Sequence, residues 1–488
     1  MKLTKKNRQW LVAMALLLPV AASAQAPKKG NAHESLVKEL TQKETTYGEA
    51  ALKIWNFAEL GYLEEKSSDL LQQLLANEGF TIQKGVAGIP TAFVASYGEG
   101  QPVIGILGEY DALPGLSQQA VPTRQPLTAG AAGHACGHHL FGVGSAAAAI
   151  AVKNWLVTTK QKGTIRFFGA PAEEGGSGKV YLVRAGLFKD VDAVLHWHPA
   201  DSNSASPGSS LANISAKFRF SGISAHAAGA PERGRSALDG VEAMDYMVNM
   251  MREHVPSDAR IHYVITQGGK APNVVPDFAE VYYYVRHPRR DVVKDMWERI
   301  VKASEGAAMG TGTTVAHEII GGTYELLPLE SLAKVMYKNL KEIGGVTYSA
   351  TEMEFAQTLQ PSLALPEGSA PALTSAADIL PYEYERTGMG STDVGDVSWT
   401  VPTVGLRTAT WVPGTAAHSW QAVAAGGTSI GRKGMMVAAK TIATTAVDLF
   451  LNPATLTEAK AELDQKRGKG FVYEALLGNR PPALDYRK

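Results

Sequence analysis

The most reactive grouping of side chains in the sequence lies in the run Gly133-His134-Ala135-Cys136-Gly137-His138-His139. Cys136 and His138 are two residues apart, where a loop enters a predicted helix. A thiolate beside an imidazole suits Zn²⁺, Co²⁺ or Mn²⁺ better than Mg²⁺ or Ca²⁺. The alternative is that Cys136 is a small buried hydrophobe. These two residues alone leave both interpretations open.

A pair of carboxylates strengthens the case for a metal site. Glu173 and Glu174 follow an apolar stretch and are flanked by Pro171 and two glycines. Adjacent carboxylates on an irregular loop point in different directions, so one can bind a metal while the other acts as a general base. An isolated pair of glutamates in such a loop would be solvated, but a position after a buried strand favours a functional role.

Three histidines are further candidate ligands, because neutral imidazole is the most common metal ligand in proteins. His196 and His198 follow an apolar stretch and point to the same side of a strand, since side chains alternate with a period of two. The spacing does not choose between them. His418 lies far away in the sequence, on a loop between a predicted strand and a predicted helix.

The elements that must position these residues form an α/β pattern. Predicted strands cover residues 103–107, 164–168 and 193–195, and a buried helix covers residues 140–156. Apolar strands alternating with helices predict a largely parallel sheet. Polar residues follow each of the three strands, and open α/β sheets bind ligands at the carboxyl ends of their strands.

The pattern changes between residues 212 and 322. There the order becomes β-α-β-β-α-β, which is typical of a ferredoxin-like unit, and alternating polar and apolar strand residues favour an antiparallel sheet with one solvated face. We interpret this stretch as a small domain inserted into a larger one that comprises residues 25–211 and 323–488. The predicted elements are strands around 217–220, 261–266, 280–285 and 313–320, and helices over 236–254 and 292–307.

The beginning of the chain indicates export. Basic residues precede the apolar stretch 10–20 and the run Ala22-Ser23-Ala24, so residues 1–24 are predicted to be a signal peptide cleaved after Ala24. We therefore expect a periplasmic or secreted protein without a membrane anchor. The 488 residues contain 47 Lys plus Arg and 47 Asp plus Glu, a balance that argues against nucleic acid as a partner. The one cysteine cannot form an internal disulfide.

Taken together, the motifs resemble the aminoacylase/carboxypeptidase family of dinuclear metallopeptidases, in the branch of the aminobenzoyl-glutamate and auxin-conjugate hydrolases. The resemblance extends from about residue 35 to 485, and the motifs occur in family order. They are Gly108-Glu109-Tyr110-Asp111-Ala112-Leu113-Pro114, His134-Ala135-Cys136-Gly137-His138, Pro171-Ala172-Glu173-Glu174-Gly175, Trp197-His198-Pro199, Gly222-Ile223-Ser224-Ala225-His226-Ala227, Pro272-Asn273-Val274-Val275-Pro276-Asp277 and Ala417-His418-Ser419.

The resemblance implies a zinc-exopeptidase-like fold and two divalent metal ions, which would be Zn, Mn, Co or Ni. It implies that Glu173 is the general base and that the ligands are Cys136, His138, Glu174, His198 and His418. His198 is thereby preferred over His196, which becomes a supporting residue. The family also inserts a ferredoxin-like lid and dimerisation domain, so a homodimer is expected.

Several other residues acquire expected roles through the same resemblance. His226 in the lid looks like the family histidine that reaches into the partner's active site and stabilises the oxyanion. Asn273 and Arg286 would contact the substrate. His139 departs from the Asp or Asn usual in this branch, and either orients a neighbouring ligand or fills space. Asp111 and Asp393 are expected to support the loops of the site.

The predicted function is hydrolysis of the amide bond in an N-acyl or N-aminoacyl amino acid, such as an aminobenzoyl-glutamate-like conjugate or a dipeptide. Glu173 would deprotonate a metal-activated water and return the proton to the leaving amine. One alternative is a thiol hydrolase with Cys136 as nucleophile and His138 as its base. The other is a binding protein for peptides or amino-acid conjugates on the same fold.

Overall fold

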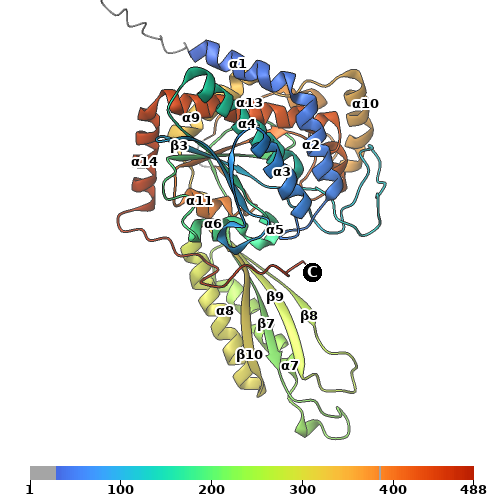
Figure 1. Cartoon of the computed structure of the whole chain (residues 1–488). Coiled ribbons are helices and arrows are strands. Elements are labelled where there is room, and N and C mark those ends of the chain that lie inside the picture. The colour runs from blue at the N-terminus through green and yellow to red at the C-terminus, as the bar shows by residue number, and fades with distance from the viewer. Residues whose placement is uncertain (1–28, 384–385, 488) are drawn as a thin grey trace, which may run out of the picture.

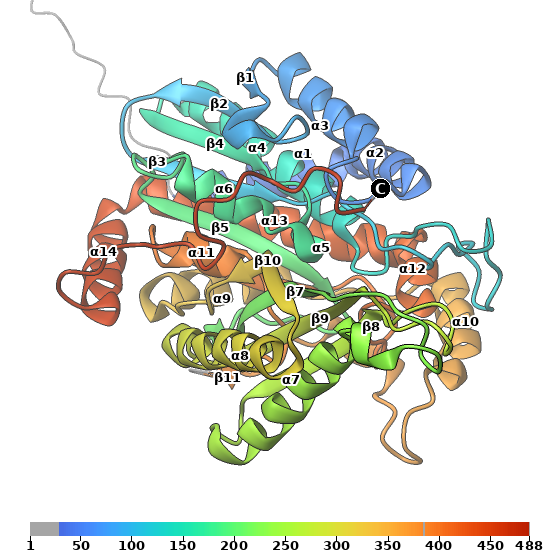
Figure 2. The same ribbon diagram turned by 90° about the horizontal axis from the view of Figure 1, so that it is seen from below.

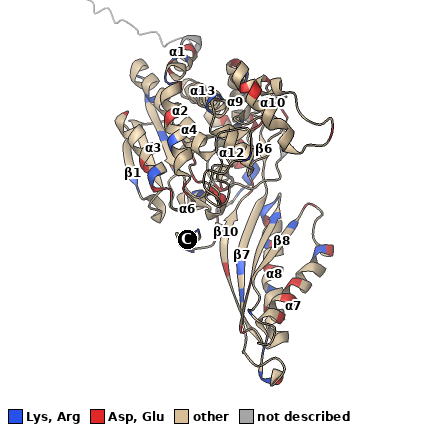
Figure 3. Ribbon diagram, turned by 90° about the vertical axis from the view of Figure 1, so that its right-hand side faces the viewer, with Lys and Arg blue, Asp and Glu red and all other residues tan. Residues whose placement is uncertain are grey.

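The computed structural model describes residues 29–383 and 386–487 and has two parts (Figure 1). The predicted signal peptide, residues 1–24, lies outside the described residues. The larger part is a sheet between helices. The smaller part projects from it as a second sheet with two helices on one face. Basic and acidic residues are interspersed over this smaller part (Figure 3).

A six-stranded sheet organises the larger part, with the strand order β1-β2-β4-β3-β5-β12. The last four of these strands are parallel, whereas β1 and β2 are joined antiparallel at one edge. This confirms the predicted α/β fold with a largely parallel sheet. The bounds are β1 Thr81–Lys84, β2 Phe93–Glu99, β3 Val103–Gly108, β4 Gly163–Gly169, β5 Ala193–Ala200 and β12 Thr403–Ala409.

Two long helices, α4 (His138–Thr159) and α13 (Ser429–Leu451), pack on each other and on the central strands. Each is long and apolar enough to cross a membrane, but 89% of the apolar window of each is buried within the fold. Helices that are apolar on all sides are typical of the core of a large protein. All six residues of β3 are buried as well, as expected for a parallel strand covered on both faces.

The other elements of the larger part surround this core or lie at the junction with the smaller part. The short helices α5 (Glu173–Gly176), α6 (Gly178–Arg184) and α11 (Val394–Ser398) lie towards the junction (Figure 1). Two short strands, β6 (Gly208–Ser209) and β11 (Arg386–Thr387), pair in parallel. The remaining helices are α1 Lys29–Gln42, α2 Glu44–Phe57, α3 Glu65–Asn77, α9 Glu330–Ile343, α10 Ala350–Leu359, α12 Trp420–Gly426 and α14 Pro453–Arg467.

The smaller part has the predicted ferredoxin-like order. Its four strands form an antiparallel sheet, β10-β7-β9-β8, and α7 and α8 pack together on one face of it. Side chains alternate along β9, so that Tyr283 is buried while Tyr282 and Tyr284 are half-buried. The bounds are β7 Ala212–Ser221, α7 Ala237–Met251, β8 Arg260–Gln267, β9 Phe278–His287, α8 Arg290–Thr311 and β10 Thr314–Thr323.

One strand is longer than its apolar run predicts. The sequence predicts a strand over residues 193–195, but β5 pairs in register with β12 as far as Ala200. Backbone pairing with a neighbouring strand sustains β5 beyond the end of its apolar residues. His196 and His198 therefore lie within the strand, and Figure 2 shows β5 crossing the sheet in one continuous arrow.

Candidate metal centre

The loop before α4 places Cys136 and His138 at the carboxyl ends of the parallel strands. Gly137, between them, has a φ of 77°, and a Cβ atom there would lie 2.7 Å from Cβ of Pro199. Any other residue would meet both an unfavourable left-handed backbone and a steric clash. The glycine thus allows both side chains to reach the same place from one tight turn.

His138 is completely buried and held between two carboxylates. Its Nδ1 lies 2.8 Å from Oδ1 of Asp111, while its Nε2 lies 3.1 Å from Oε2 of Glu109 without forming a hydrogen bond. Burial opposes the charged ring, but Cys136, Asp111 and Glu109 together raise the pKa of His138 well above its usual value. A carboxylate on Nδ1 orients the ring and leaves Nε2 as the candidate ligand atom.

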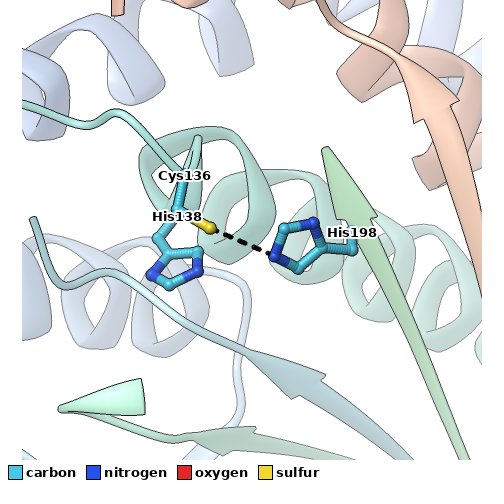
Figure 4. A group of neighbouring side chains, drawn as sticks. All are labelled: Cys136, His138 and His198. Carbon is cyan, nitrogen blue, oxygen red and sulfur yellow. Dashed lines mark hydrogen bonds between the residues drawn. The ribbon is translucent and has the colours of Figure 1, made fainter. Parts of the chain in front are cut away.

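His198 faces Cys136 from β5 across the site (Figure 4). The two atoms closest to each other are Nε2 of His198 and Sγ of Cys136, 3.4 Å apart. Nδ1 of His198 lies 2.7 Å from the carbonyl oxygen of Pro199 and donates its hydrogen to it when the ring is neutral. Burial lowers the pKa of His198 well below its usual value, which favours the neutral imidazole that binds metals.

Glu173 and Glu174 lie on the short turn of α5, whose backbone is not helical throughout. Glu174 has a ψ of 64°, and Gly175 has a φ of 93°. The N–H of Glu174 donates to Oδ2 of Asp111 at 2.9 Å, so Asp111 holds both this loop and His138. Oε1 of Glu174 forms an ion pair of 3.1 Å with Nε2 of His418.

His418 reaches the site from a loop in which it has a left-handed φ of 60°. Its backbone N–H donates to the carbonyl oxygen of Ala135 at 2.9 Å, which ties this loop directly to the one that carries Cys136. The hydrogen bond with Glu174 raises the pKa of His418, although burial opposes the shift. The loops that carry Cys136, Glu174 and His418 are therefore connected to one another.

The ligand atoms fall into two groups that share Cys136. Cys136, His138 and His198 form one group, and Cys136, Glu174 and His418 form the other, each with its atoms within 4.8 Å of one another. Sulfur, imidazole and carboxylate donors suit Zn²⁺ and similar ions. The buried Nε2 of His138 has no hydrogen-bond partner, as expected for an atom that awaits a metal. The residues present thus fit a pair of divalent cations.

Glu173 lies beside these groups and forms a third cluster of candidate ligand atoms with Glu109 and His138. Burial, followed by the nearby charges of Glu109 and Glu174, raises the pKa of Glu173 well above that of an ordinary glutamate. A carboxylate with a raised pKa can hold a proton that an ordinary glutamate would release. Divalent cations nearby would oppose this shift and favour the ionised base.

Sequence reasoning missed a buried cation next to the site. Nζ of Lys179 lies 2.6 Å from Oε1 of Glu109 and 2.6 Å from Oδ1 of Asp393, and all three side chains are at most 1% exposed. Burial opposes a charged amine, but these two carboxylates raise the pKa of Lys179. The only sequence signal was its place just after the Glu173-Glu174 loop, where a lysine is usually solvated.

Three predicted supporting residues lie in different places. Asp393 belongs to the Lys179 network described above. His196 faces Gly405 of β12 and belongs to none of the three ligand groups. His139 turns away from the cluster: Nε2 lies 3.1 Å from the carbonyl oxygen of Gly426, and its ring packs on His134. Burial lowers the pKa of His139 to about 3, which favours its neutral ring.

The predicted substrate residues of the smaller part are not brought to this cluster together. His226 and Asn273 are exposed and lie side by side, with a bridge between His226 and Val274, on the loops that follow β7 and β8. Those loops are at the end of the sheet farthest from the larger part (Figure 1). Arg286 is near the opposite end of β9, where its guanidinium lies 5.0 Å from the ring of Tyr284.

Comparison with known proteins connects this site with hydrolases. A profile of peptidase family M20/M25/M40 matches residues 105–443. One of the two kinds of subunit of p-aminobenzoyl-glutamate hydrolase from Escherichia coli is 44% identical over 443 residues, which cover 86% of this chain and 92% of that protein. A mouse Xaa-Arg dipeptidase is 28% identical over 438 residues, covering 86% of this chain and 89% of that protein.

A solved structure shows the same fold. A dinuclear metal-binding peptidase of the M20 family from Bacillus subtilis superposes with a TM-score of 0.57 at 17% identity, covering 84% of this chain and 99% of that one. At this identity the likeness concerns the fold alone.

Proposed function

Because the chain belongs to peptidase family M20/M25/M40, we propose that it is a metal-dependent amidohydrolase that cleaves the amide bond of an N-acyl or N-aminoacyl amino acid. The observation that carries this proposal is the sharing of Cys136 by two groups of ligand atoms, with the half-buried carboxylate of Glu173 beside them. This arrangement places a proton acceptor where a hydrolytic water would be activated.

In this proposal Cys136, His138 and His198 hold one divalent ion, and Cys136, Glu174 and His418 hold the other. The ions, of Zn, Mn, Co or Ni, would supply Lewis acidity that polarises the scissile carbonyl and acidifies a water molecule. Glu173 accepts the proton of that water and delivers it to the leaving nitrogen. Asp111 holds His138 and the Glu174 loop in place during this transfer, through one hydrogen bond to each.

We further propose that the substrate is an aminobenzoyl-glutamate-like conjugate or a dipeptide. The two relatives described above are named for a conjugate of glutamate and for a dipeptide, and both kinds of substrate place an amino acid on one side of an amide bond. Arg286 has a buried Nε without a hydrogen-bond partner, and a guanidinium recognises carboxylates. Asn273, which lies beside His226 at the far end of the smaller part, would add an amide donor to the site of a second chain.

The two alternative functions are less favoured. A thiol hydrolase needs a cysteine with a lowered pKa, whereas burial, with Glu174 nearby, raises the pKa of the Cys136 thiol. It would also leave Glu174 and His418 without a role. A binding protein would have no use for Glu173 beside a set of metal ligands, because an acid-base group serves turnover and not affinity.

A substrate screen with one variant tests the proposal. The metal-loaded protein is incubated with p-aminobenzoyl-glutamate, acyl amino acids and dipeptides, and the products are identified by mass spectrometry. We expect cleavage of at least one amide, loss of turnover in Glu173→Gln with metal content unchanged, and normal turnover in the exposed control Glu99→Gln. Full activity in Glu173→Gln, or no cleavage with any metal, contradicts the proposal.

We also propose that the chain works as a dimer through its smaller part. The edge strand β8 exposes Val264 and Ile265 at 64% and 40%, and α7 exposes Tyr246 and Met250 at 68% and 51%. Exposed apolar side chains on an edge strand and on a helix of the same domain are typical of surfaces that an interface covers. Because the Escherichia coli relative is named as one of two kinds of subunit, native mass spectrometry should compare the chain alone with mixtures that contain a second, related chain.

Export is proposed on sequence grounds alone. Residues 1–24 have the basic start, apolar centre and small-residue end of a cleavable signal peptide. Fractionation of cells that express the full chain, followed by mass spectrometry of the N-terminal peptide, should find the protein outside the cytoplasm and beginning at Gln25. Recovery of an intact N-terminal peptide from the cytoplasmic fraction is the opposing outcome.

A further inference from the structure

The segment of residues 468–487 follows α14 without forming a helix or a strand. It leaves the larger part near α14, crosses the junction between the two parts, and ends beside α5 (Figures 1 and 2). A segment of this length without regular structure is uncommon inside a compact fold unless it has a role of its own. Its end lies next to the turn that carries Glu173 and Glu174.

The segment is fixed to both parts of the molecule along its course. The hydroxyl of Tyr473 donates to Oδ1 of Asp396 at 2.7 Å, and Leu477 is 2% exposed. Further on, Arg480 bridges the two parts: its guanidinium donates to Oε1 of Glu318 on β10 at 3.0 Å, and its carbonyl oxygen accepts from Arg184 of α6 at 2.7 Å. These contacts fix the course of the segment on its way to α5.

At its end, the segment binds the backbone of Glu174. The hydroxyl of Tyr486 and Nη2 of Arg487 both donate to the carbonyl oxygen of Glu174, at 3.1 Å and 2.7 Å. The ring of Tyr486 packs edge-on against Tyr62, 5.5 Å between centroids. A Cβ atom on Gly61 would lie 2.2 Å from the Tyr486 hydroxyl oxygen, so the glycine provides the space that this contact requires.

The turn that receives these bonds has an unfavourable backbone. Ala172 and Ser177 have left-handed φ values of 56° and 58°, which residues other than glycine rarely adopt, and Gly175 is left-handed as well. Such a conformation persists only when its surroundings hold it. Both backbone groups of Glu174 are held in this way. Asp111 accepts a hydrogen bond from its N–H, and Tyr486 and Arg487 donate to its carbonyl oxygen.

We propose that Tyr486 and Arg487 are positioning residues that direct the carboxylate of Glu174 towards Cys136 and His418 and so set the metal affinity of that ligand group. This inference rests on the proposed function, since it requires that Cys136, Glu174 and His418 hold an ion. Groups that orient a ligand from behind commonly change metal affinity by about 10- to 100-fold. The other group, Cys136, His138 and His198, does not contain Glu174 and serves as an internal reference.

Zinc titration of the full chain tests this inference. Zinc is removed and returned in competition with a chromophoric chelator, for the wild type, Tyr486→Phe, Arg487→Ala, the double variant, and a chain shortened by residues 485–488. We expect two zinc ions per chain in the wild type. In the double and shortened variants one ion should bind about 10- to 100-fold more weakly and the other as before. Excess zinc should restore their turnover.

Two further variants separate positioning from mere stability. Arg487→Lys keeps a donor near the Glu174 carbonyl and should recover much of the affinity lost in Arg487→Ala, whereas Asp485→Ala alters an exposed neighbour and should bind zinc normally. Unchanged affinity for both ions in the double and shortened variants overturns the inference while the proposed function stands. A wild-type chain that binds no zinc, manganese or cobalt overturns the proposed function itself.

Discussion

The cluster around Cys136 and the far end of the smaller sheet are built in opposite ways. At the cluster, Cys136 and His138 are buried, and one side chain, Asp111, holds both His138 and the Glu174 loop. At the far end, His226 is exposed, and its Nδ1 accepts hydrogen bonds from the N–H groups of Ala228 and Gly229. The first region gathers its groups from several loops of one chain, whereas the second leaves a single histidine exposed at the surface.

The largest effect should come from the shared ligand. Cys136→Ala removes an atom from both ligand groups, so we expect both ions to be lost and activity to fall to background. His198→Ala affects one group and should leave one ion bound. Metal analysis of the purified variants measures the difference. Equal metal loss in the two variants would show that Cys136 is not shared.

His226→Ala should lower kcat by about 10²- to 10³-fold without loss of metal, if His226 stabilises the oxyanion of another chain's substrate. Mixing subunits tests this directly. In a mixed dimer of His226→Ala and Glu173→Gln, one site regains both residues, so activity should exceed that of either variant alone. The exposed His254→Ala serves as the matched control. No recovery on mixing would place His226 outside the partner's site.

Stability should differ between ion pairs of the two regions. Lys179→Met removes the amine that Glu109 and Asp393 share in the interior, and we expect a loss of about 3–5 kcal/mol in the free energy of unfolding. Lys217→Met, in the smaller part, removes a pair of 3.4 Å in which the lysine is 33% exposed, and should cost less than about 1 kcal/mol. Urea denaturation of the metal-free proteins measures both. Similar losses would remove the contrast between the regions.

The smallest expected effect is on the pH dependence of stability, through Asp245 in the smaller part. Burial, opposed by a hydrogen bond from Tyr283, raises the pKa of Asp245 from 3.8 to about 6. The folded state then binds more protons than the unfolded state between these values, so Asp245 makes stability fall as pH rises from 4 to 6. Asp245→Asn should reduce that fall by on the order of 1 kcal/mol. An identical pH profile for the variant in urea denaturation would show that Asp245 titrates normally.

Residues whose neighbours in sequence reveal their role could be predicted, and residues whose partners lie far away could not. Apolar strands alternating with helices predicted the larger sheet, and strands of alternating polar and apolar residues predicted the smaller one. The structure confirms this fold. Lys179 went unnoticed because its partner Asp393 is 214 residues away. The same reason hid Tyr486 and Arg487, which the sequence places only in a tail after two prolines, 312 and 313 residues from Glu174. The length of β5 also depended on pairing with β12, not on its own apolar residues.

The attachment of the smaller part has a mechanical consequence. The chain enters it through β7 and leaves it through β10, and these two strands are hydrogen-bonded neighbours from Asn213 and Thr323 onwards. Two connections that lie side by side resist twisting of one part against the other more than a single connection would. The Arg480–Glu318 contact crosses the same junction close to β10, and the guanidinium of Arg290 lies 3.5 Å from the ring of Trp399, so side chains restrain the smaller part in addition to the two strands.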